Sequence, residues 1–271
     1  MHKVGAFLEA GGNKVFFVNG ILSILRREQV SVDLFVGSSS SAAIIVATLL
    51  GQNREVMESF AQRLDSNKRN FYAFKRPHFP QNKIYKDSVR SLSDDYIRSR
   101  PIGAFNIIAA RTSIRLVSLK CFLSSVVLAL SFGAGINAIS LFRKMFKITE
   151  LRITEKDRLS PEELSSFIMG SSMIYPFIKP HTFKDSLLLE GALMEPKFER
   201  ELAQCQKRIV IHTEQGTSHK IGDTFHFFSD RPIPSNILDY TNGAAVHNLH
   251  AMGESVAEAQ LQLLKNFLEQ D

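Results

Sequence analysis

Hydrophobic and polar residues along this chain follow two alternating patterns. Short, nearly continuous apolar runs that end at glycine or serine are typical of buried strands, and the stretches between them repeat apolar residues at helical spacing. The pattern predicts strands at 2–9, 31–37, 104–110, 186–190, 208–213 and 224–229. It predicts helices at 13–28, 39–50, 53–64, 84–98, 160–169 and over much of 236–268. Strands that alternate with helices in this way indicate an α/β fold with a mainly parallel central sheet.

The helix at 160–169 has a clear local start signal. Ser160 precedes Pro161, which suits the first helical position, and Glu163 follows three residues after the serine. This spacing predicts a capping box, in which the side chains of Ser160 and Glu163 bind backbone N–H groups of the first turn.

A strand-to-helix junction carries the first candidate for chemistry. The apolar run at 32–36 ends at Gly37, four serines follow, and a buried helix begins directly after them. This is the setting of a nucleophile elbow, where a serine at the tip of a strained turn presents its hydroxyl above the sheet. Ser39 occupies the tip, and Gly37 and Ser41 stand where small residues are needed. The same sequence also fits a serine-rich turn that only caps a helix.

Two further segments add groups that can act together with such a serine. Gly11 and Gly12 lie between a strand and an apolar helix, so their backbone N–H groups, with that of Asn13, are free to bind a developing oxyanion. Glu190 ends an apolar run and precedes Gly191. If buried, this carboxylate is either paired or functional, because an isolated buried charge is costly.

In order and spacing, these three segments resemble the patatin-like phospholipase family. That family has a glycine-rich oxyanion loop near its N-terminus, then a GxSxG elbow, then a DG[GA] motif that supplies the acid of a Ser/Asp dyad. Lys14 matches the basic residue that follows the family's loop. The resemblance covers nearly the whole chain except residues from about 113 to 148.

The resemblance implies a three-layer α/β/α fold and a lipid acyl hydrolase of the phospholipase A or lysophospholipase type. Its substrate would be a phospholipid or another acyl lipid. Ser39 and Glu190 would form the catalytic dyad, and the oxyanion hole would consist of Gly11, Gly12 and Asn13.

Three departures from the family pattern bear on activity. Ala10 stands at the first loop glycine, Ser41 stands at the second elbow glycine, and Glu190 replaces the aspartate of the dyad. The extra methylene of Glu190 is expected to displace the base by about 1.5 Å, a scale at which activity falls ~100-fold unless the backbone compensates. The alternative to an active hydrolase is therefore a catalytically weak or inactive relative that binds membranes or acts as a scaffold.

A Ser/Glu/His triad is a third possibility. The order Ser39, Glu190 and then a later histidine follows that of the α/β-hydrolases. The candidate histidines are His212, His247 and His250. The elbow lies earlier in the chain than that fold usually places it, so the dyad is favoured.

The segment outside the family pattern is strongly apolar. Residues 121–142 include no charged side chain, which is long enough for a membrane-spanning candidate, and cations flank both ends. One crossing would separate two parts of the same domain, whereas a helical hairpin bent at 133–135 would not. We expect residues 115–145 to contact an anionic membrane or to cover the active site, and a buried helix pair or an oligomer interface is the competing interpretation.

Composition and charge narrow the remaining choices. The 271 residues are 44% hydrophobic with no visible linker or repeat, which favours a single domain over 1–271 with the apolar insertion at about 113–148. The formal charge of +6 comes from scattered cations without a nucleic-acid-binding motif, so acidic lipid is a better partner than nucleic acid.

The cysteines and the N-terminus indicate the compartment. Cys121 and Cys205 lack the spacing of metal ligands, and the first residues lack the apolar stretch of a secretory signal. We therefore expect no metal or other cofactor, and a cytoplasmic protein that attaches to the membrane only peripherally. The sequence does not predict the oligomeric state.

Overall fold

The structure is a computed structural model that describes residues 2–73, 78–133, 138–234 and 239–270. The strands in these ranges are β1 (His2–Leu8), β2 (Leu34–Ser38), β3 (Ala104–Ser113), β4 (Thr149–Thr154), β5 (His181–Phe183), β6 (Ser186–Leu189), β7 (Cys205–Gln215), β8 (His219–Ile221) and β9 (Thr224–Ser229). The α-helices are α1 (Val15–Arg27), α2 (Ser40–Leu50), α3 (Asn53–Asp65), α4 (Gln81–Ser99), α5 (Val117–Gly133), α6 (Ile139–Met145), α7 (Pro161–Ser171), α8 (Phe198–Glu201) and α9 (Gly243–Glu269). Two short 3₁₀ turns are η1 (Gly12–Lys14) and η2 (Gly191–Met194).

One sheet contains all of these strands, and its centre is parallel. β3, β2, β1, β7 and β9 lie side by side in that order and run in the same direction. β4, β5, β6 and β8 add antiparallel pairs toward the margins. The mainly parallel central sheet that the sequence predicts is confirmed.

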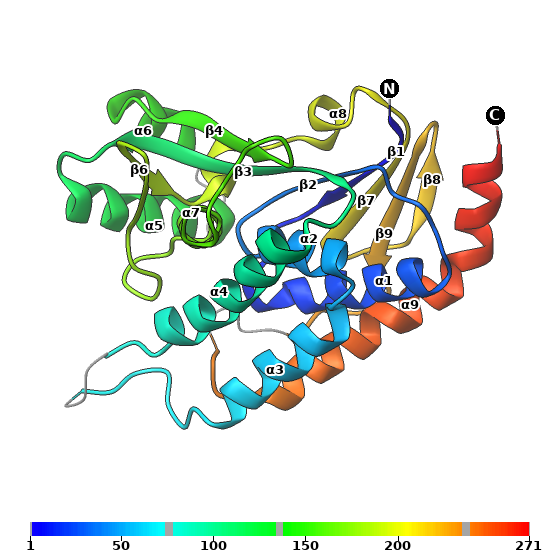
Figure 1. Cartoon of the computed structure of the whole chain (residues 1–271), viewed down its shortest axis with the longest axis horizontal. Helices are drawn as coiled ribbons and strands as arrows, with labels where there is room; N and C mark the ends of the chain where they lie inside the picture. Colours follow the sequence, from blue (N-terminus) through cyan, green and yellow to red (C-terminus); the bar gives the residue numbers. More distant parts are fainter. Residues whose placement is uncertain (1, 74–77, 134–137, 235–238, 271) are drawn as a thin grey trace.

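The sheet separates two apolar cores, which gives the fold three layers (Figure 1). On β1, Ala6 and Leu8 face the first core, which includes residues of α1, α2, α3, α4, α7 and α9. Phe7 faces the second core, which includes residues of α5 and α6. This alternation follows from the two-residue period of a strand, and burial on both faces explains the continuous apolar runs. The prediction of a three-layer α/β/α fold is confirmed.

β2 and β6 meet end to end along one edge of β3. β4 occupies the other edge, because residues 106–108 of β3 pair with both β2 and β4 and Ala110 pairs with both β4 and β6. β2 runs parallel to β3 and β6 runs antiparallel to it, so the carboxyl ends of β2 and β6 point toward each other. The residues that follow these two strands therefore meet in space although they are far apart in the sequence.

The sequence missed four short elements, β4, β5, β8 and α8. β4 has the sequence Thr-Glu-Leu-Arg-Ile-Thr, which lacks a continuous apolar run. In the described part of the sheet it pairs with β3 alone, so it is an edge strand with little need for such a run. The helix predicted over 236–268 begins at Gly243, and residues 236–238 lie outside the described residues.

The helix predicted at 160–169 has the local structure that its sequence indicates. Ser160 Oγ accepts from the backbone N–H of Glu163 at 3.2 Å, and the Glu163 carboxylate accepts from the backbone N–H of Ser160 at 2.8 Å. The capping box is confirmed at the start of α7.

The apolar insertion forms α5 and α6, and both helices bury one face in the second core. Cys121 and Leu128 of α5 and Ile139 and Phe142 of α6 are buried there. Part of the bend predicted at 133–135 lies outside the described residues. None of the helices in the described ranges is both long and apolar enough to cross a membrane. The interpretation of a buried helix pair is therefore right for the inner faces of these two helices.

Candidate active site

Ser39 lies at the turn between β2 and α2 in the strained conformation expected of a nucleophile elbow. Its backbone has φ 57° and ψ −138°, a region that residues with a side chain rarely adopt. The backbone N–H of Ser39 donates to Ser171 Oγ at 2.8 Å, and the Ser171 hydroxyl donates to the carbonyl of Ile108 at 2.6 Å. α7 thus fixes the turn to β3 through one buried serine.

The small residues on both sides of Ser39 have distinct structural reasons. A Cβ at Gly37 would lie 3.0 Å from Ser41 Cβ and 3.1 Å from Ile45 Cδ1, so the first turn of α2 packs directly on this glycine. The Ser41 hydroxyl donates to the backbone carbonyl of Glu9 at 2.6 Å. Serine at the second glycine position is therefore accommodated, and it ties the elbow to the end of β1.

Glu190 follows β6 and reaches the serine at the tip of the elbow. The Ser39 hydroxyl donates to Glu190 Oε2 at 3.1 Å, and Glu190 Oε1 accepts from the backbone N–H of Ala192 at 3.4 Å. Both side chains are buried. The structure brings together the two residues that the family pattern pairs, and the longer glutamate side chain stays within hydrogen-bond distance.

Gly191 allows this close approach. A Cβ on Gly191 would lie 2.4 Å from the carbonyl oxygen of Ile108 and 2.6 Å from Ser38 Cβ. Only a residue without a side chain lets the start of η2 lie against β3 and the elbow at the same time. The sequence motif that follows Glu190 therefore has a steric cause.

Burial changes the acidity of Glu190. It raises the pKa of the carboxyl to about 8, because the ionised form loses its hydration. Hydrogen bonds from Ser39 and from the backbone N–H groups of Ala192 and Gly191 act in the opposite direction and lower the pKa. A carboxyl with this pKa can accept and return a proton near neutral pH, as a general base for a serine hydroxyl must.

The glycine loop lies beside the elbow. Gly12 has φ 54°, which favours glycine, and no side chain caps the first turn of η1, which begins at Gly12. The backbone N–H of Lys14 closes the loop by donating to the carbonyl of Gly11 at 3.0 Å. Asn13 is buried, and its side-chain amide donates to the carbonyl of Asp239 at 2.7 Å. The side chain of Asn13 thus anchors the loop. Gly12 and Asn13 line the same cavity as Ser39.

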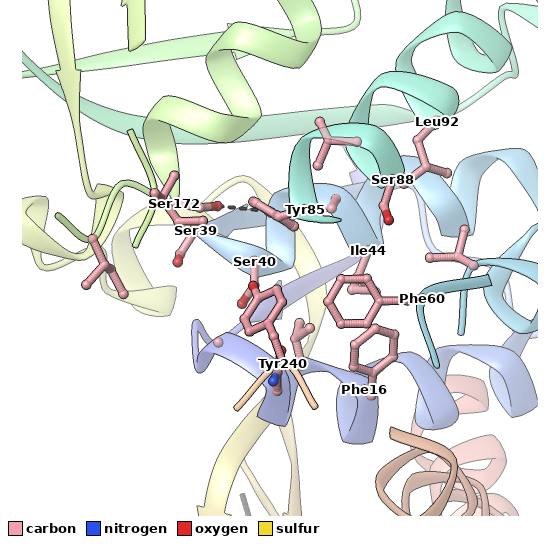
Figure 2. A pocket seen from close by; sticks show the side chains of 18 residues that line it. Phe16, Ser39, Ser40, Ile44, Phe60, Tyr85, Ser88, Leu92, Ser172 and Tyr240 are labelled. Atoms are coloured by element: carbon pink, nitrogen blue, oxygen red, sulfur yellow. Dashed lines mark hydrogen bonds between the residues drawn. The ribbon is translucent and has the colours of Figure 1, made fainter. Parts of the chain in front are cut away.

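A narrow, mostly apolar cavity of about 60 Å³ connects Ser39 with the first core. Figure 2 shows Ser39 and Ser172 at one end and the rings of Phe16 and Phe60 toward the other, with Tyr240 between them. The centroids of the Phe16 and Phe60 rings are 5.1 Å apart. The mostly apolar lining of the cavity suits the first carbons of a hydrocarbon chain attached to a reacting carbonyl.

Two polar groups in this cavity are not evident from the sequence. The Tyr85 hydroxyl lies 2.9 Å from Ser172 Oγ (Figure 2), and burial raises the pKa of Tyr85, so it stays protonated. The hydroxyl of Ser40 is buried and has no hydrogen-bond partner among the described residues. Neither could be placed from the sequence, because their positions depend on how α2, α4 and α7 pack.

The histidines considered for a triad lie elsewhere. His212 Nδ1 is 2.7 Å from Glu9 Oε1 and its Nε2 is 3.0 Å from His226, whereas His250 contacts Asn19 and Glu254. His247 is exposed on α9. In the described part of the chain the hydrogen-bond partner of the Ser39 side chain is Glu190 rather than a histidine.

Ser171 is the functional residue that sequence reasoning missed. It orients the backbone of Ser39, yet it lies at the last position of α7 with no motif that marks it. The only signal was a run of small residues before the third motif, at Ser171 and Ser172. That run indicates close packing without saying what is packed.

Comparison with protein families gives a match. A family model described as patatin-like phospholipase matches residues 7–202, which include the loop, the elbow, the insertion and Glu190. No curated protein sequence matches the chain.

Proposed function

We propose that this chain, which belongs to the patatin-like phospholipase family, is a lipid acyl hydrolase in which Ser39 is the nucleophile and Glu190 the general base. The family suggests hydrolysis of acyl esters in lipids in general. The assignment of the two residues rests on one observation above all, the 3.1 Å contact between Ser39 Oγ and Glu190 Oε2 at the end of an apolar cavity.

The reaction follows from this geometry. Ser39 Oγ attacks the ester carbonyl while Glu190 takes its proton, and backbone N–H groups of the loop Gly11, Gly12 and Asn13 stabilise the oxyanion that forms. Collapse of this intermediate breaks the ester bond, and Glu190 returns the proton to the departing alcohol. Water, deprotonated by Glu190, then attacks the acyl-serine and releases the fatty acid and the free Ser39 hydroxyl. No step requires a cofactor.

The cavity supports an acyl lipid as substrate. Its walls present Phe16, Phe60 and Leu92 to whatever is bound at Ser39. Burial of each methylene of an acyl chain on such a surface contributes about 0.8 kcal/mol to binding. A phospholipid or lysophospholipid is therefore the substrate class that we infer, and the protein meets it as a peripheral protein on the cytoplasmic face of a membrane.

We propose that residues 1–271 form one functional unit. α9 packs along α1, and β7 and β9 extend the central sheet beyond the end of the family match at residue 202. The loop at Asn13 is held by Asp239, which also lies beyond that point. A truncation at the family boundary would remove a support of the proposed oxyanion hole.

The first prediction concerns the nucleophile. Replacement of Ser39 by alanine removes the attacking oxygen, so hydrolysis of a short-chain ester should fall by at least roughly 1,000-fold without a change in the fold. Turnover, covalent labelling by a fluorophosphonate probe and circular dichroism together measure this. Ser40→Ala is the matched control, because the structure gives the Ser40 hydroxyl no hydrogen-bond partner in the described ranges, and the variant should retain labelling.

Two outcomes would contradict the assignment. Labelling that persists in Ser39→Ala would place the nucleophile at another residue. A parent protein that takes up no probe and hydrolyses no ester across pH 6 to 9 would favour the alternative of an inactive relative that serves as a scaffold.

A further inference from the structure

Exposed apolar side chains are concentrated on the outer face of the insertion. Eight of the twelve large hydrophobic residues exposed in the described part of the chain lie between residues 114 and 145. We call them the apolar patch: Ile114, Leu116, Leu119, Phe122, Val126, Leu130, Leu141 and Met145. A concentration of this kind marks a surface that binds something apolar.

Each of the two helices of the insertion carries apolar residues on two opposite faces. Leu119, Phe122, Val126 and Leu130 lie within about 80° of the circumference of α5, since successive residues turn by about 100°. Cys121 and Leu128 lie on the other side of the helix, in the second core. The second helix, α6, repeats the arrangement, with Ile139 and Phe142 inside and Leu141 and Met145 exposed. α5 and α6 contact each other, so the patch continues from one helix to the next.

The segment that includes the patch carries positive charge only. No aspartate or glutamate occurs between Asp95 and Glu150, whereas this interval includes eight lysines and arginines. Arg115, Lys144 and Lys147 are exposed beside the patch.

Two other cations of the segment already have polar partners. Lys120 is turned inward and donates to Thr112 and Ser113, and Arg143 pairs with Glu195 at 3.7 Å. The exposed cations are therefore the ones available to a partner.

We propose that the apolar patch docks on an anionic lipid bilayer, with its apolar side chains among the acyl chains and Arg115, Lys144 and Lys147 on the headgroups. A second copy of this chain fits less well, because two patches face to face would bring together two segments that carry lysines and arginines but no acidic residue. The bilayer supplies both the apolar phase and the negative charge. This inference rests on the proposed lipid substrate.

The patch is linked to the active site by one short connection. Ser125 of α5 accepts a hydrogen bond from the backbone N–H of Tyr175 at 2.9 Å. Tyr175 follows Ile174, which lines the cavity together with Ser39 and Ser172. Through this contact α5 is connected to a segment that borders the cavity.

Flotation with vesicles tests the apolar contribution. The protein should float with vesicles of equimolar phosphatidylcholine and phosphatidylserine, and Phe122→Glu/Leu141→Glu should weaken partitioning at least about 100-fold at any salt concentration. The matched control is Ile221→Glu/Leu263→Glu, two exposed apolar residues of β8 and α9 outside the patch, which should float as the parent does. All four positions are exposed, so the fold should survive, and urea denaturation checks this.

A second pair of variants tests the charge. Arg115→Ala/Lys144→Ala should weaken binding to the same vesicles about 30-fold at low salt and little at high salt. Lys156→Ala/Arg158→Ala removes the same residue types from an exposed turn at the other end of β4 and should change nothing. Vesicles of phosphatidylcholine alone should bind both pairs equally.

The docking proposal and the proposed hydrolysis fail separately. Flotation is measured in the Ser39→Ala background, where no lipid is consumed, and turnover of a short, soluble ester is measured in the patch variants, where it should equal that of the parent. Absence of flotation by a folded protein would overturn the docking proposal. So would equal loss in the patch variant and its control, or concentration-dependent dimerisation that Phe122→Glu/Leu141→Glu abolishes while flotation persists.

Discussion

Glu190 occupies a position that is unfavourable for an ionised carboxylate. It is only 3% exposed, and its contacts are the hydroxyl of Ser39 and the backbone N–H groups at the start of η2. Among the residues that the structure describes, no cation pairs with it. Each of these hydrogen bonds favours ionisation, but the loss of hydration outweighs them and leaves the pKa at about 8. The same burial that destabilises the charge makes the carboxylate a stronger base toward Ser39.

The second prediction is a pH dependence of hydrolysis. Only the ionised form of Glu190 can accept the serine proton, so kcat/KM should rise about tenfold per pH unit below a pKa near 8 and level off above it. Glu190→Gln should lose nearly all turnover at every pH. Glu190→Asp should also lose activity, because the existing contact is already 3.1 Å and a shorter side chain withdraws the carboxylate. A profile that is flat between pH 6 and 9 would contradict this role.

The stability of Glu190→Gln tests independently whether the pKa of Glu190 is raised in the folded protein. Between the usual carboxyl pKa of 4.5 and the folded value near 8, the folded protein retains a proton that the unfolded chain has lost. The free energy of unfolding therefore decreases as pH rises through this window. Glu190→Gln lacks that contribution, so in urea denaturation it should gain stability relative to the parent at pH 8 and not at pH 4.5.

At the scale of elements, β2 and β6 pair with the same edge of β3, and their carboxyl ends point toward each other. Ser39 follows β2 and Glu190 follows β6. Ser171 of α7 holds the elbow against β3. Each of these contacts joins a segment to backbone rather than to a mobile side chain. The distance between nucleophile and base is therefore set by strand register, and small residues at the junction are required.

The third prediction concerns this junction. Gly191→Ala places a methyl group 2.4 Å from the carbonyl oxygen of Ile108, which belongs to the sheet and cannot easily move. The carboxylate of Glu190 should shift by about 1 Å, which is expected to reduce kcat about 100-fold. Enzyme kinetics measure this. Gly222→Ala, in the turn between β8 and β9, is the control for backbone strain without a clash: its φ of 55° disfavours alanine, although a Cβ there meets no described atom within 4 Å. It should lower stability and leave kcat unchanged, so equal loss of kcat in both variants would contradict the steric explanation.

At the scale of the whole molecule, the proposed active site and the apolar patch belong to helices on opposite faces of the sheet. The cavity at Ser39 is formed by helices of the first core, whereas the patch lies on the helices that cover the second core. α5 and α6 are therefore structural and outward-facing at once. Removal of the whole insertion would uncover Val36, Ile108 and Leu189, so the insertion is a layer rather than a detachable lid.

The fourth prediction separates these two roles on a single helix. Leu128 is buried in the second core, whereas Leu130, two residues further along α5, is exposed. Leu128→Ala should lower the free energy of unfolding by about 2–4 kcal/mol, and Leu130→Ala should change it by less than about 0.5 kcal/mol. Urea denaturation of the two variants measures the difference. Equal effects would mean that α5 does not present these faces to core and surface.

The sequence by itself determined the features that depend on neighbours along the chain. The buried strands and the capping box at Ser160 follow from local sterics and periodicity, which a short window of residues specifies. The same kind of window indicated a turn at Ser39 but fitted both an elbow and a helix cap. The family motifs added the order of loop, elbow and acid, which the match over 7–202 supports.

Only the tertiary structure decided how residues from distant segments meet. Whether glutamate reaches a serine 151 positions away depends on the registers of β2 and β6 on β3, and its pKa depends on how completely other segments exclude water. The same holds for Ser171, which no motif marks, and for α5, which is apolar on both faces. A sequence that is apolar all round does not say which face meets the core, because that choice is made by the surface on which the helix packs.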